Sequence, residues 1–395
     1  MPGLLKQQRW SRVAPAVLSL ALVLILGLLL TACQQGPPPP PSSETPVSPG
    51  TSGPPASAPP GTSGPPASAP PGTSGSSSPA GPSSPTTSAP AAVHFTAQGD
   101  IGLSTGAREV LDTINGLGSE LNLALGDFSY EAGREQEFCD MVTGKLGADF
   151  PYQVVTGNHE SDGHDGDIAN IVNCLPNKLP GLIGEYGIQW YADYPARDPL
   201  VRFIMVSPGI KFHDGNTLDY SRGSERWLWT AAALDGARSK KIPWTVVGMH
   251  TPCLSVGKYD CQAGRDFTNL LIDKKADLVV TGHDHNYQRS HQLGRGQDCP
   301  ALVPDTFSGG CLADPDNAMV QGAGTVFATV GTGGVGLYEV NDQDPEPPYF
   351  AAWSGKNREA ALGTLDVTAT ADRLSARFVP AADYTFTDSF EIKQK

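Results

Sequence analysis

The chain is short of charge, and of positive charge above all. Charged residues make up 17% of its 395 residues, whereas about a quarter is usual for a soluble domain. Acidic residues outnumber basic ones by 41 to 27, so the formal net charge is −14 at pH 7. Because no basic patch interleaved with aromatic residues is visible, we expect no binding of nucleic-acid polymers. Positive charge for an anionic ligand would come from bound cations or from single residues such as Arg289.

The chain also lacks any Cys-x-x-Cys pair, which argues against a thiolate metal site. An even number of cysteines follows Cys33, and together with the signs of export described below it predicts disulfides. Proximity in the sequence favours the pairs Cys139–Cys174, Cys253–Cys261 and Cys299–Cys311. Each of these bonds would staple a loop rather than a sheet.

Charge is almost absent between Gln34 and Ala92, where Glu44 is the single charged residue. This segment consists mainly of Pro, Ser, Gly, Thr and Ala, and residues 50–60 recur unchanged at 61–71. Such a composition cannot build a packed core. We therefore interpret residues 33–92 as an extended linker, as in a stalk across a cell wall.

The first 32 residues have the organisation of an export signal. Basic residues precede an apolar stretch from Val13 to Leu30, and Leu30-Thr31-Ala32-Cys33 follows. This ending resembles the lipobox of bacterial lipoproteins, which implies cleavage after residue 32 and membrane attachment through a lipidated Cys33. The expected location is extracytoplasmic, at the cell surface. The alternative is an uncleaved membrane anchor.

Beyond residue 92, short β-rich runs alternate with stretches that have helical character. The expected strands are 93–97, 121–125, 152–155, 244–247 and 276–280, and the expected helices are 106–115, 133–146, 224–238 and 264–274. Alternation of this kind predicts a mostly parallel sheet with right-handed crossovers. Loops at the carboxyl ends of such strands gather at one edge, where ligands bind.

Each expected strand is followed by a short polar motif that contains metal-binding side chains. These side chains are Asp100, Asp127, Tyr130, Asn158, His250, His283 and His285. Carboxylate, amide and imidazole donors suit iron, zinc or manganese. Asp127 can offer both carboxylate oxygens and so can bridge two ions. Two cations roughly 3.5–4 Å apart could activate a hydroxide for attack on a phosphoester.

The motifs Gly99-Asp100-Ile101-Gly102, Gly126-Asp127-Phe128-Ser129-Tyr130, Gly157-Asn158-His159-Glu160, Met249-His250 and Gly282-His283-Asp284-His285 closely resemble those of purple acid phosphatases, within the calcineurin-like metallophosphoesterases. The resemblance extends over about residues 93 to 390. It implies one metal held by Asp100, Asp127, Tyr130 and His285, and a second held by Asp127, Asn158, His250 and His283. It also implies that His159 lies near the bound phosphate.

The fold that the resemblance implies is α/β, a two-sheet β-sandwich flanked by helices in four layers. Residues 93–395 would form this single catalytic domain. Four later segments have strand character and fit the second half of the sandwich: 325–330, 362–368, 375–379 and 389–392. A tight loop near the metals is expected at residues 331–334.

Tyr130 distinguishes the chain from relatives that carry Asp-x-His in the first motif, because Gly102 stands where that histidine would be. A tyrosinate favours ferric iron. We therefore expect two metal ions, with iron at the first position and iron, zinc or manganese at the second.

The sequence departs from plant-type purple acid phosphatases after His250, because no histidine follows before His283. The identity of the acid that protonates the leaving group is consequently left open. His164 is one candidate for this catalytic role beside His159. Lys258 or Tyr259 could instead bind phosphate, on a loop closed by Cys253 and Cys261.

The sequence as a whole predicts an exported phosphatase that hydrolyses small phosphate monoesters by means of a hydroxide activated by two metals. A phosphodiesterase or nucleotidase on the same scaffold is the enzymatic alternative. A surface lipoprotein that binds without catalysis is the alternative from another class. The oligomeric state is not predicted.

Overall fold

The computed structural model describes residues 91–161 and 163–395. The expected signal segment 1–32, Cys33 and all but the last two residues of the expected linker therefore lie outside the described residues. Within the described part, no helix has the length and apolar character that crossing a membrane requires.

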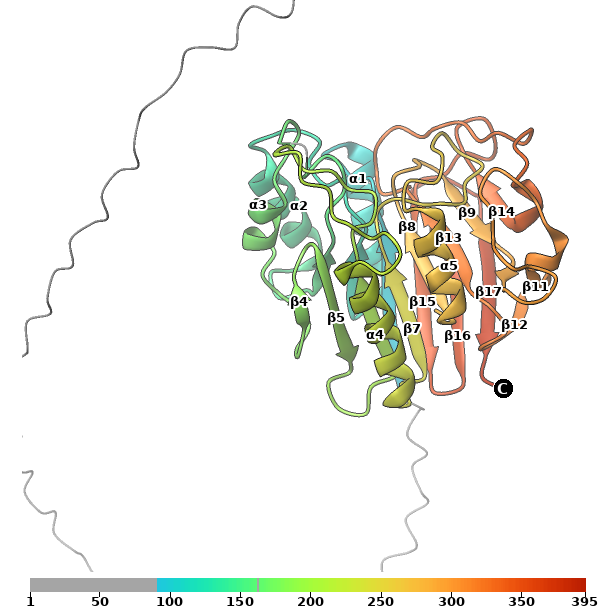
Figure 1. Cartoon of the computed structure of the whole chain (residues 1–395). Coiled ribbons are helices and arrows are strands. Elements are labelled where there is room, and N and C mark those ends of the chain that lie inside the picture. Colours follow the sequence, from blue (N-terminus) through green and yellow to red (C-terminus); the bar gives the residue numbers. More distant parts are fainter. Residues whose placement is uncertain (1–90, 162) are drawn as a thin grey trace, which may run out of the picture. The chain divides into compact units, whose positions relative to one another are not determined.

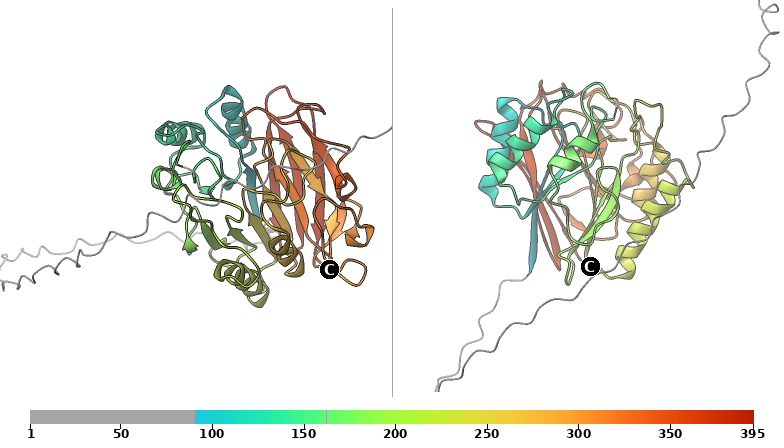
Figure 2. Two further views of the ribbon diagram at one scale, coloured as in Figure 1. Left: turned by 45° about the horizontal axis from the view of Figure 1, so that its top comes forward. Right: turned by 90° about the vertical axis from the view of Figure 1, so that its left-hand side faces the viewer.

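Two β-sheets pack face to face, and helices cover their outer faces (Figures 1 and 2). The first sheet has seven strands in the order β12-β17-β16-β15-β1-β2-β3. Its strands are β1 (Ala92–Gln98), β2 (Leu121–Ala124), β3 (Tyr152–Val154), β12 (Ala318–Val320), β15 (Gly363–Thr370), β16 (Arg373–Pro380) and β17 (Asp388–Lys393). The strands β1, β2 and β3 run parallel, and β15, β16 and β17 continue the sheet antiparallel.

The second sheet has eight strands in the order β14-β9-β13-β8-β7-β6-β5-β4. These are β4 (Ile183–Glu185), β5 (Gln189–Tyr194), β6 (Val201–Met205), β7 (Trp244–Gly248), β8 (Leu278–Thr281), β9 (Tyr287–Ser290), β13 (Val326–Val330) and β14 (Phe350–Ser354). Its centre, β6-β7-β8-β13, is parallel. Strands β10 (Gln292–Leu293) and β11 (Leu312–Asp314) form a separate, antiparallel pair.

Local sequence explains where the covering helices begin. Ser104 and Ser224 cap α1 (Thr105–Leu117) and α4 (Glu225–Ser239) by accepting a backbone N–H three residues ahead. Asp167 caps α3 (Ile168–Cys174) in a similar way. The helices α1, α2 (Glu135–Leu146) and α3 lie on the side of the first sheet, and α4 and α5 (Arg265–Asp273) lie on the second (Figure 2).

The core lies between the two sheets. Phe95 of β1 meets Phe203 of β6 edge to face, with ring centroids 5.0 Å apart. Trp190 and Trp244 are fully buried. The four-layer sandwich that was expected is thus confirmed.

Two details of the expected topology are wrong. The sheets are mixed rather than mostly parallel, because β15, β16 and β17 follow one another without crossover helices and pair antiparallel. The strands after His285 also do not form one half of the sandwich: β13 enters the second sheet, while β15 to β17 extend the first.

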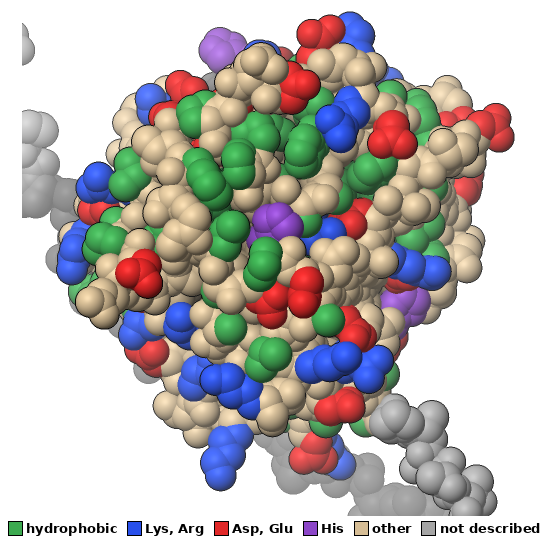
Figure 3. Space-filling model, turned by 90° about the vertical axis from the view of Figure 1, so that its right-hand side faces the viewer, with side chains coloured by type: hydrophobic (Ala, Val, Ile, Leu, Met, Phe, Trp, Pro, Cys, Tyr) green, Lys and Arg blue, Asp and Glu red, His purple; other side chains and the backbone are tan. Residues whose placement is uncertain are grey.

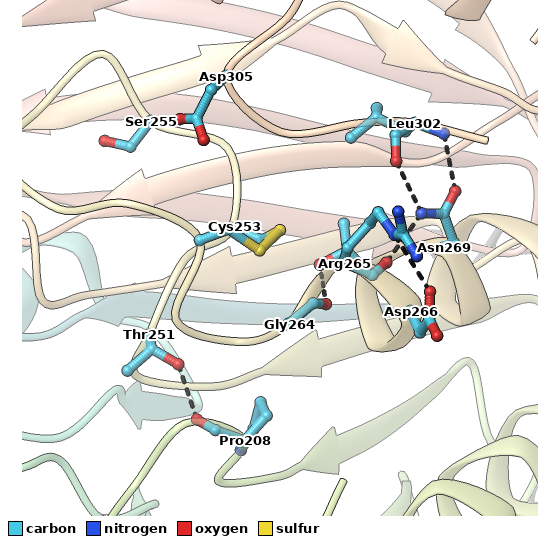
Figure 4. Close-up of a disulfide and its surroundings, with 12 residues drawn as sticks. Pro208, Thr251, Cys253, Ser255, Gly264, Arg265, Asp266, Asn269, Leu302 and Asp305 are labelled. Carbon is cyan, nitrogen blue, oxygen red and sulfur yellow. Dashed lines mark hydrogen bonds and ion pairs between the residues drawn. A yellow bond between two sulfur atoms is a disulfide. The ribbon is translucent and has the colours of Figure 1, made fainter. Parts of the chain in front are cut away.

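All three expected disulfides are present. Cys139 and Cys174 join α2 to α3, so this bond links two helices rather than closing a single loop. Cys253 and Cys261 close the loop after β7 (Figure 4). At the base of that loop, Thr251 donates a hydrogen bond to the carbonyl of Pro208 at 2.7 Å.

Candidate metal centre

The structure brings all seven expected ligand side chains together at the carboxyl ends of parallel strands. Asp100, Asp127 and Asn158 follow β1, β2 and β3 of the first sheet, and the three histidines follow β7 and β8 of the second. Backbone hydrogen bonds join these loops. For example, the N–H of Asp100 donates to the carbonyl of Gly126 at 3.1 Å. The site therefore lies where the carboxyl ends of the parallel strands of the two sheets come together.

Four side chains form a first cluster around the hydroxyl of Tyr130. Its oxygen lies 3.2 Å from Asp100 Oδ1, 3.4 Å from Asp127 Oδ2 and 3.3 Å from His285 Nε2. His285 Nε2 lies 3.3 Å from Asp100 Oδ1. Ligand atoms bound at about 2.0–2.2 Å to one cation lie about 3 Å apart. The spacing of this cluster therefore fits a single ion.

A second cluster surrounds His250 Nε2. This nitrogen lies 3.2 Å from Asp127 Oδ2, 3.1 Å from Asn158 Oδ1 and 3.1 Å from His283 Nδ1. Ligand atoms of Asp127, His250 and His283 all lie within 4.8 Å of one another. Because Asp127 Oδ2 belongs to both clusters, this carboxylate is placed to bridge two ions.

Two of the histidines are oriented by backbone carbonyls. His250 Nδ1 lies 2.7 Å from the oxygen of Leu125, and His285 Nδ1 lies 2.9 Å from the oxygen of Gly336. A carbonyl only accepts, so each Nδ1 donates, and in the neutral ring the lone pair of Nε2 points into the cluster. Lone pairs of nitrogen and oxygen thus converge within each cluster, which is the arrangement a cation requires.

The charges around the clusters also favour a cation. Burial opposes protonation of His250, but the neighbouring Asp127 outweighs it and raises the pKa of His250 to about 9. Burial, Asp100 and Asp127 raise the pKa of Tyr130, whereas a cation at its oxygen would act in the opposite direction. His283 Nε2 is buried without a hydrogen-bond partner among the described residues. These residues therefore fit metal ions.

Four of the seven have a backbone conformation that is rare for residues with a side chain. The φ angles are 61° for Asp100, 57° for Asp127, 59° for Tyr130 and 69° for His283. Such positive values are strained in residues other than glycine, and this strain gathers at functional sites. It is held here by the surrounding hydrogen bonds.

Close approach between the loops depends on Gly157. A Cβ atom at this position would collide with the carboxylate and backbone nitrogen of Asp127. The buried carboxylate of Glu160 accepts the backbone N–H groups of Asp127, Phe128 and Gly157. Glu160 completes the third motif, but no role was expected for it.

His159 and His164, the two expected catalytic histidines, occupy different surroundings. The ring of His159 lies against Tyr130, with centroids 4.2 Å apart, and its Nε2 is 3.8 Å from Asp127 Oδ2. His159 Nδ1 pairs with Asp165 Oδ2 at 2.9 Å, a partner that the sequence did not suggest. His164 is exposed on the loop that carries Asp165.

The loop closed by Cys253 and Cys261 reaches the cluster. Tyr259 stacks on His283, with ring centroids 4.0 Å apart. Tyr338, which was not predicted, stacks on His285 at 3.9 Å. No motif marks Tyr338, which lies in the irregular segment after β13.

Arg289 does not supply positive charge to the site, contrary to expectation. Its buried guanidinium forms two hydrogen bonds with Asp388, at 2.8 Å and 2.7 Å, and one with Asn317 at 2.9 Å. The tight loop 331–334 does lie at the metal edge, since a Cβ at Gly331 would come within 2.9 Å of Asp100 Oδ2.

The chain is similar in sequence to known phosphoesterases. Residues 93–287 match the model of the calcineurin-like phosphoesterase family. Purple acid phosphatase 18 of Arabidopsis thaliana is 25% identical over 221 residues, or 53% of this chain and 47% of that protein. Phosphoenolpyruvate phosphatase of Allium cepa is 24% identical over 278 residues, or 66% and 53%. The chain spans about half the length of these curated relatives.

A solved structure supports the fold. The purple acid phosphatase from seeds of yellow lupin, Lupinus luteus, aligns with a TM-score of 0.59 and 18% sequence identity. The alignment covers 78% of this chain and 55% of that chain. Residues 93–287 therefore form a calcineurin-like phosphoesterase domain, and the chain is related to the purple acid phosphatases.

Proposed function

We propose that the chain is a metal-dependent phosphatase that hydrolyses phosphate monoesters at two adjacent cations. The observation that carries this proposal is the pair of clusters that share Asp127 Oδ2. Hydrolysis breaks the bond between phosphorus and the leaving oxygen and joins phosphorus to the oxygen of water, while a proton passes to the departing alcohol. Two bound cations would supply Lewis acidity and lower the pKa of a water.

The protein's own residues would bind and orient the ester beside these cations. His159 Nδ1 is occupied by Asp165, so its Nε2 is left to face a phosphoryl oxygen. Its side chain is 28% exposed, which leaves it accessible from solvent. We assign His159 to phosphate binding, and Tyr130 with the six other expected ligands to the metals, with iron in the Tyr130 cluster and iron, zinc or manganese in the other.

The test is metal analysis and hydrolysis with the purified full chain. We expect two metals per chain, and faster hydrolysis of 4-nitrophenyl phosphate than of bis(4-nitrophenyl) phosphate. Asp127→Asn and His250→Ala should reduce both metal content and turnover to background. Asp112→Asn is the matched control, because this exposed carboxylate pairs with Lys145 on the surface.

The alternatives give different results in the same experiment. Faster hydrolysis of the diester would favour a phosphodiesterase. A metal-loaded chain that hydrolyses neither ester would refute the phosphatase and favour a binding lipoprotein.

We also propose that the enzyme is exported and is held at the cell surface through a lipidated Cys33. Three disulfides among the described residues support an oxidising compartment. The face in Figure 3 carries acidic and basic side chains interspersed, so this face offers no continuous basic patch for a nucleic acid. Mass spectrometry of the mature amino terminus tests the anchor, and an intact segment 1–32 would exclude it.

A further inference from the structure

Both imidazoles of the Gly-His-x-His motif carry a tyrosine ring on one face. Tyr259 stacks on His283 with 18° between the ring planes, and Tyr338 stacks on His285 with 11°. The ammonium group of Lys258 lies over both tyrosines, 4.8 Å from the centre of the Tyr259 ring and 4.5 Å from that of Tyr338. Cation–π attraction favours this position. A positive charge is therefore held one ring away from the candidate metal cluster.

The loop that carries this charge is fixed to the same motif. The backbone N–H of Lys258 donates to Asp284 Oδ1 at 2.7 Å, and the hydroxyl of Ser255 donates to Asp284 Oδ2. Asp284 lies between the two stacked histidines in sequence. The disulfide between Cys253 and Cys261 closes the loop behind it. The disulfide and the two hydrogen bonds to Asp284 thus hold the loop of Lys258 close to the cluster.

An open groove begins beside Tyr338. It has a volume of about 410 Å³ and is lined by Lys258, Leu337, Tyr338, Glu339 and Lys356. The backbone N–H of Lys356 donates to the carbonyl of Tyr338 at 2.8 Å, which places the second lysine next to the ring that covers His285. The groove and the cluster are therefore neighbours that share Tyr338.

The charge of this groove is positive in a chain that is strongly negative overall. Its lining residues include two lysines, Lys258 and Lys356, and one glutamate, Glu339. The nearest hydrogen-bond partner of Lys258 Nζ is the hydroxyl of Tyr259 at 3.2 Å, which carries no charge to balance it. An anionic group in the groove would gain attraction that a neutral group would not.

We propose that this groove receives the leaving group of the substrate and that Lys258 binds an anionic group on it. The preferred substrates are then phosphate monoesters whose leaving group carries a carboxylate or a second phosphate. Tyr259 and Tyr338 act as positioning residues, because the ammonium group lies over their rings and these rings cover the two histidines. The inference rests on the proposed phosphatase function.

A pair of esters that differ in charge but not in shape tests it, namely 4-carboxyphenyl phosphate and 4-carbamoylphenyl phosphate. The full metal-loaded chain should favour the carboxylate in kcat/KM by about five- to tenfold. Lys258→Met should lower kcat/KM for the carboxylate ester more than for the neutral ester and so abolish this preference, and Lys258→Arg should restore it. The preference should also shrink with added salt, because the groove is open.

The matched control is Lys240→Met, since Lys240 is exposed at the far end of α4, where it pairs with Asp193. Metal content is measured for every variant. If the metal-loaded wild type hydrolyses neither ester, the phosphatase function itself fails. If it hydrolyses both without preference, or if Lys258→Met slows both equally, the phosphatase stands and the leaving-group site is refuted.

Discussion

The carboxylate of Glu160 accepts the backbone N–H of Asp127 at 3.0 Å. It also accepts the N–H of Phe128 at 2.6 Å and that of Gly157 at 3.0 Å. One buried side chain therefore joins the loop after β2 to the loop after β3. Because Asp127 has a positive φ angle and belongs to both clusters, Glu160 holds the residue shared by the clusters in its strained position.

Replacement of Glu160 by Gln should therefore weaken metal binding. In the wild type the Glu160 carboxylate accepts three backbone N–H groups. The NH₂ of the introduced glutamine is a donor, so it would face these N–H groups without accepting from them. We expect a loss of metal affinity of about 10- to 100-fold and a loss of about 1–3 kcal/mol in the free energy of unfolding. Metal analysis after competition with a chelator measures the first. Glu135→Gln is the control, because this carboxylate is equally buried in α2; an equal loss in both variants would contradict the prediction.

Tyr130 should give the metal-loaded protein its colour. A phenolate bound to ferric iron absorbs visible light by charge transfer, and the Tyr130 hydroxyl is the phenol oxygen placed among Asp100, Asp127 and His285. Tyr130→Phe should abolish the visible band, whereas Tyr338→Phe should retain it. If the iron-loaded, active wild type lacked such a band, Tyr130 would not be a metal ligand.

The sequence identified the seven clustered side chains because each follows a strand of the parallel part of a sheet. Parallel strands place their carboxyl ends together, so residues distant in sequence could be assigned to one edge. Tyr338 and Asp165 could not be found in this way. Each reaches the site from an irregular loop, and its contact with a histidine ring depends on the tertiary path of that loop.

The fold was predictable to the level of layers but not of strand order. The longer helices, such as α1, were expected near their observed bounds, whereas α3 has only seven residues and was not expected. The assignment of β13 and β15 to different sheets depends on long-range pairing, which no local pattern in either strand encodes.

The buried pair of Arg289 and Asp388 should contribute strongly to stability, although it takes no part in the site. The two side chains are 1% and 7% exposed. Arg289→Met would leave the carboxylate with only the hydroxyl of Tyr287, at 2.8 Å, among the partners described for it. We expect a loss of about 3–5 kcal/mol in the free energy of unfolding. Chemical denaturation measures it.

The control for this prediction is Arg377→Met. Arg377 pairs with Asp366 at 2.8 Å, but its side chain is 62% exposed. Asp366 is buried but keeps His94 Nε2 as a second partner, so the exposed Arg377 should contribute less than about 1 kcal/mol. Similar losses in the two variants would contradict a special role of the buried pair.

Glu346 should make stability depend on pH. It accepts the backbone N–H groups of Ser255 and Asp305, each at 2.8 Å, and so joins the disulfide-closed loop to the segment after β10. Burial raises the pKa of Glu346 to about 7 from its usual 4.5. The folded state therefore binds a proton more tightly than the unfolded state does.

Because the pKa is higher in the folded state, the contribution of Glu346 to stability is greatest below pH 4.5 and declines as pH rises to about 7. The size of this decline is about 3 kcal/mol. Glu346→Gln removes the titrating group, so its free energy of unfolding should fall less over this interval than that of the wild type. Denaturant unfolding at pH 4.5, 5.5, 6.5 and 7.5 measures the difference. Parallel pH profiles for the two proteins would mean that the carboxylate of Glu346 titrates alike in the folded and unfolded states.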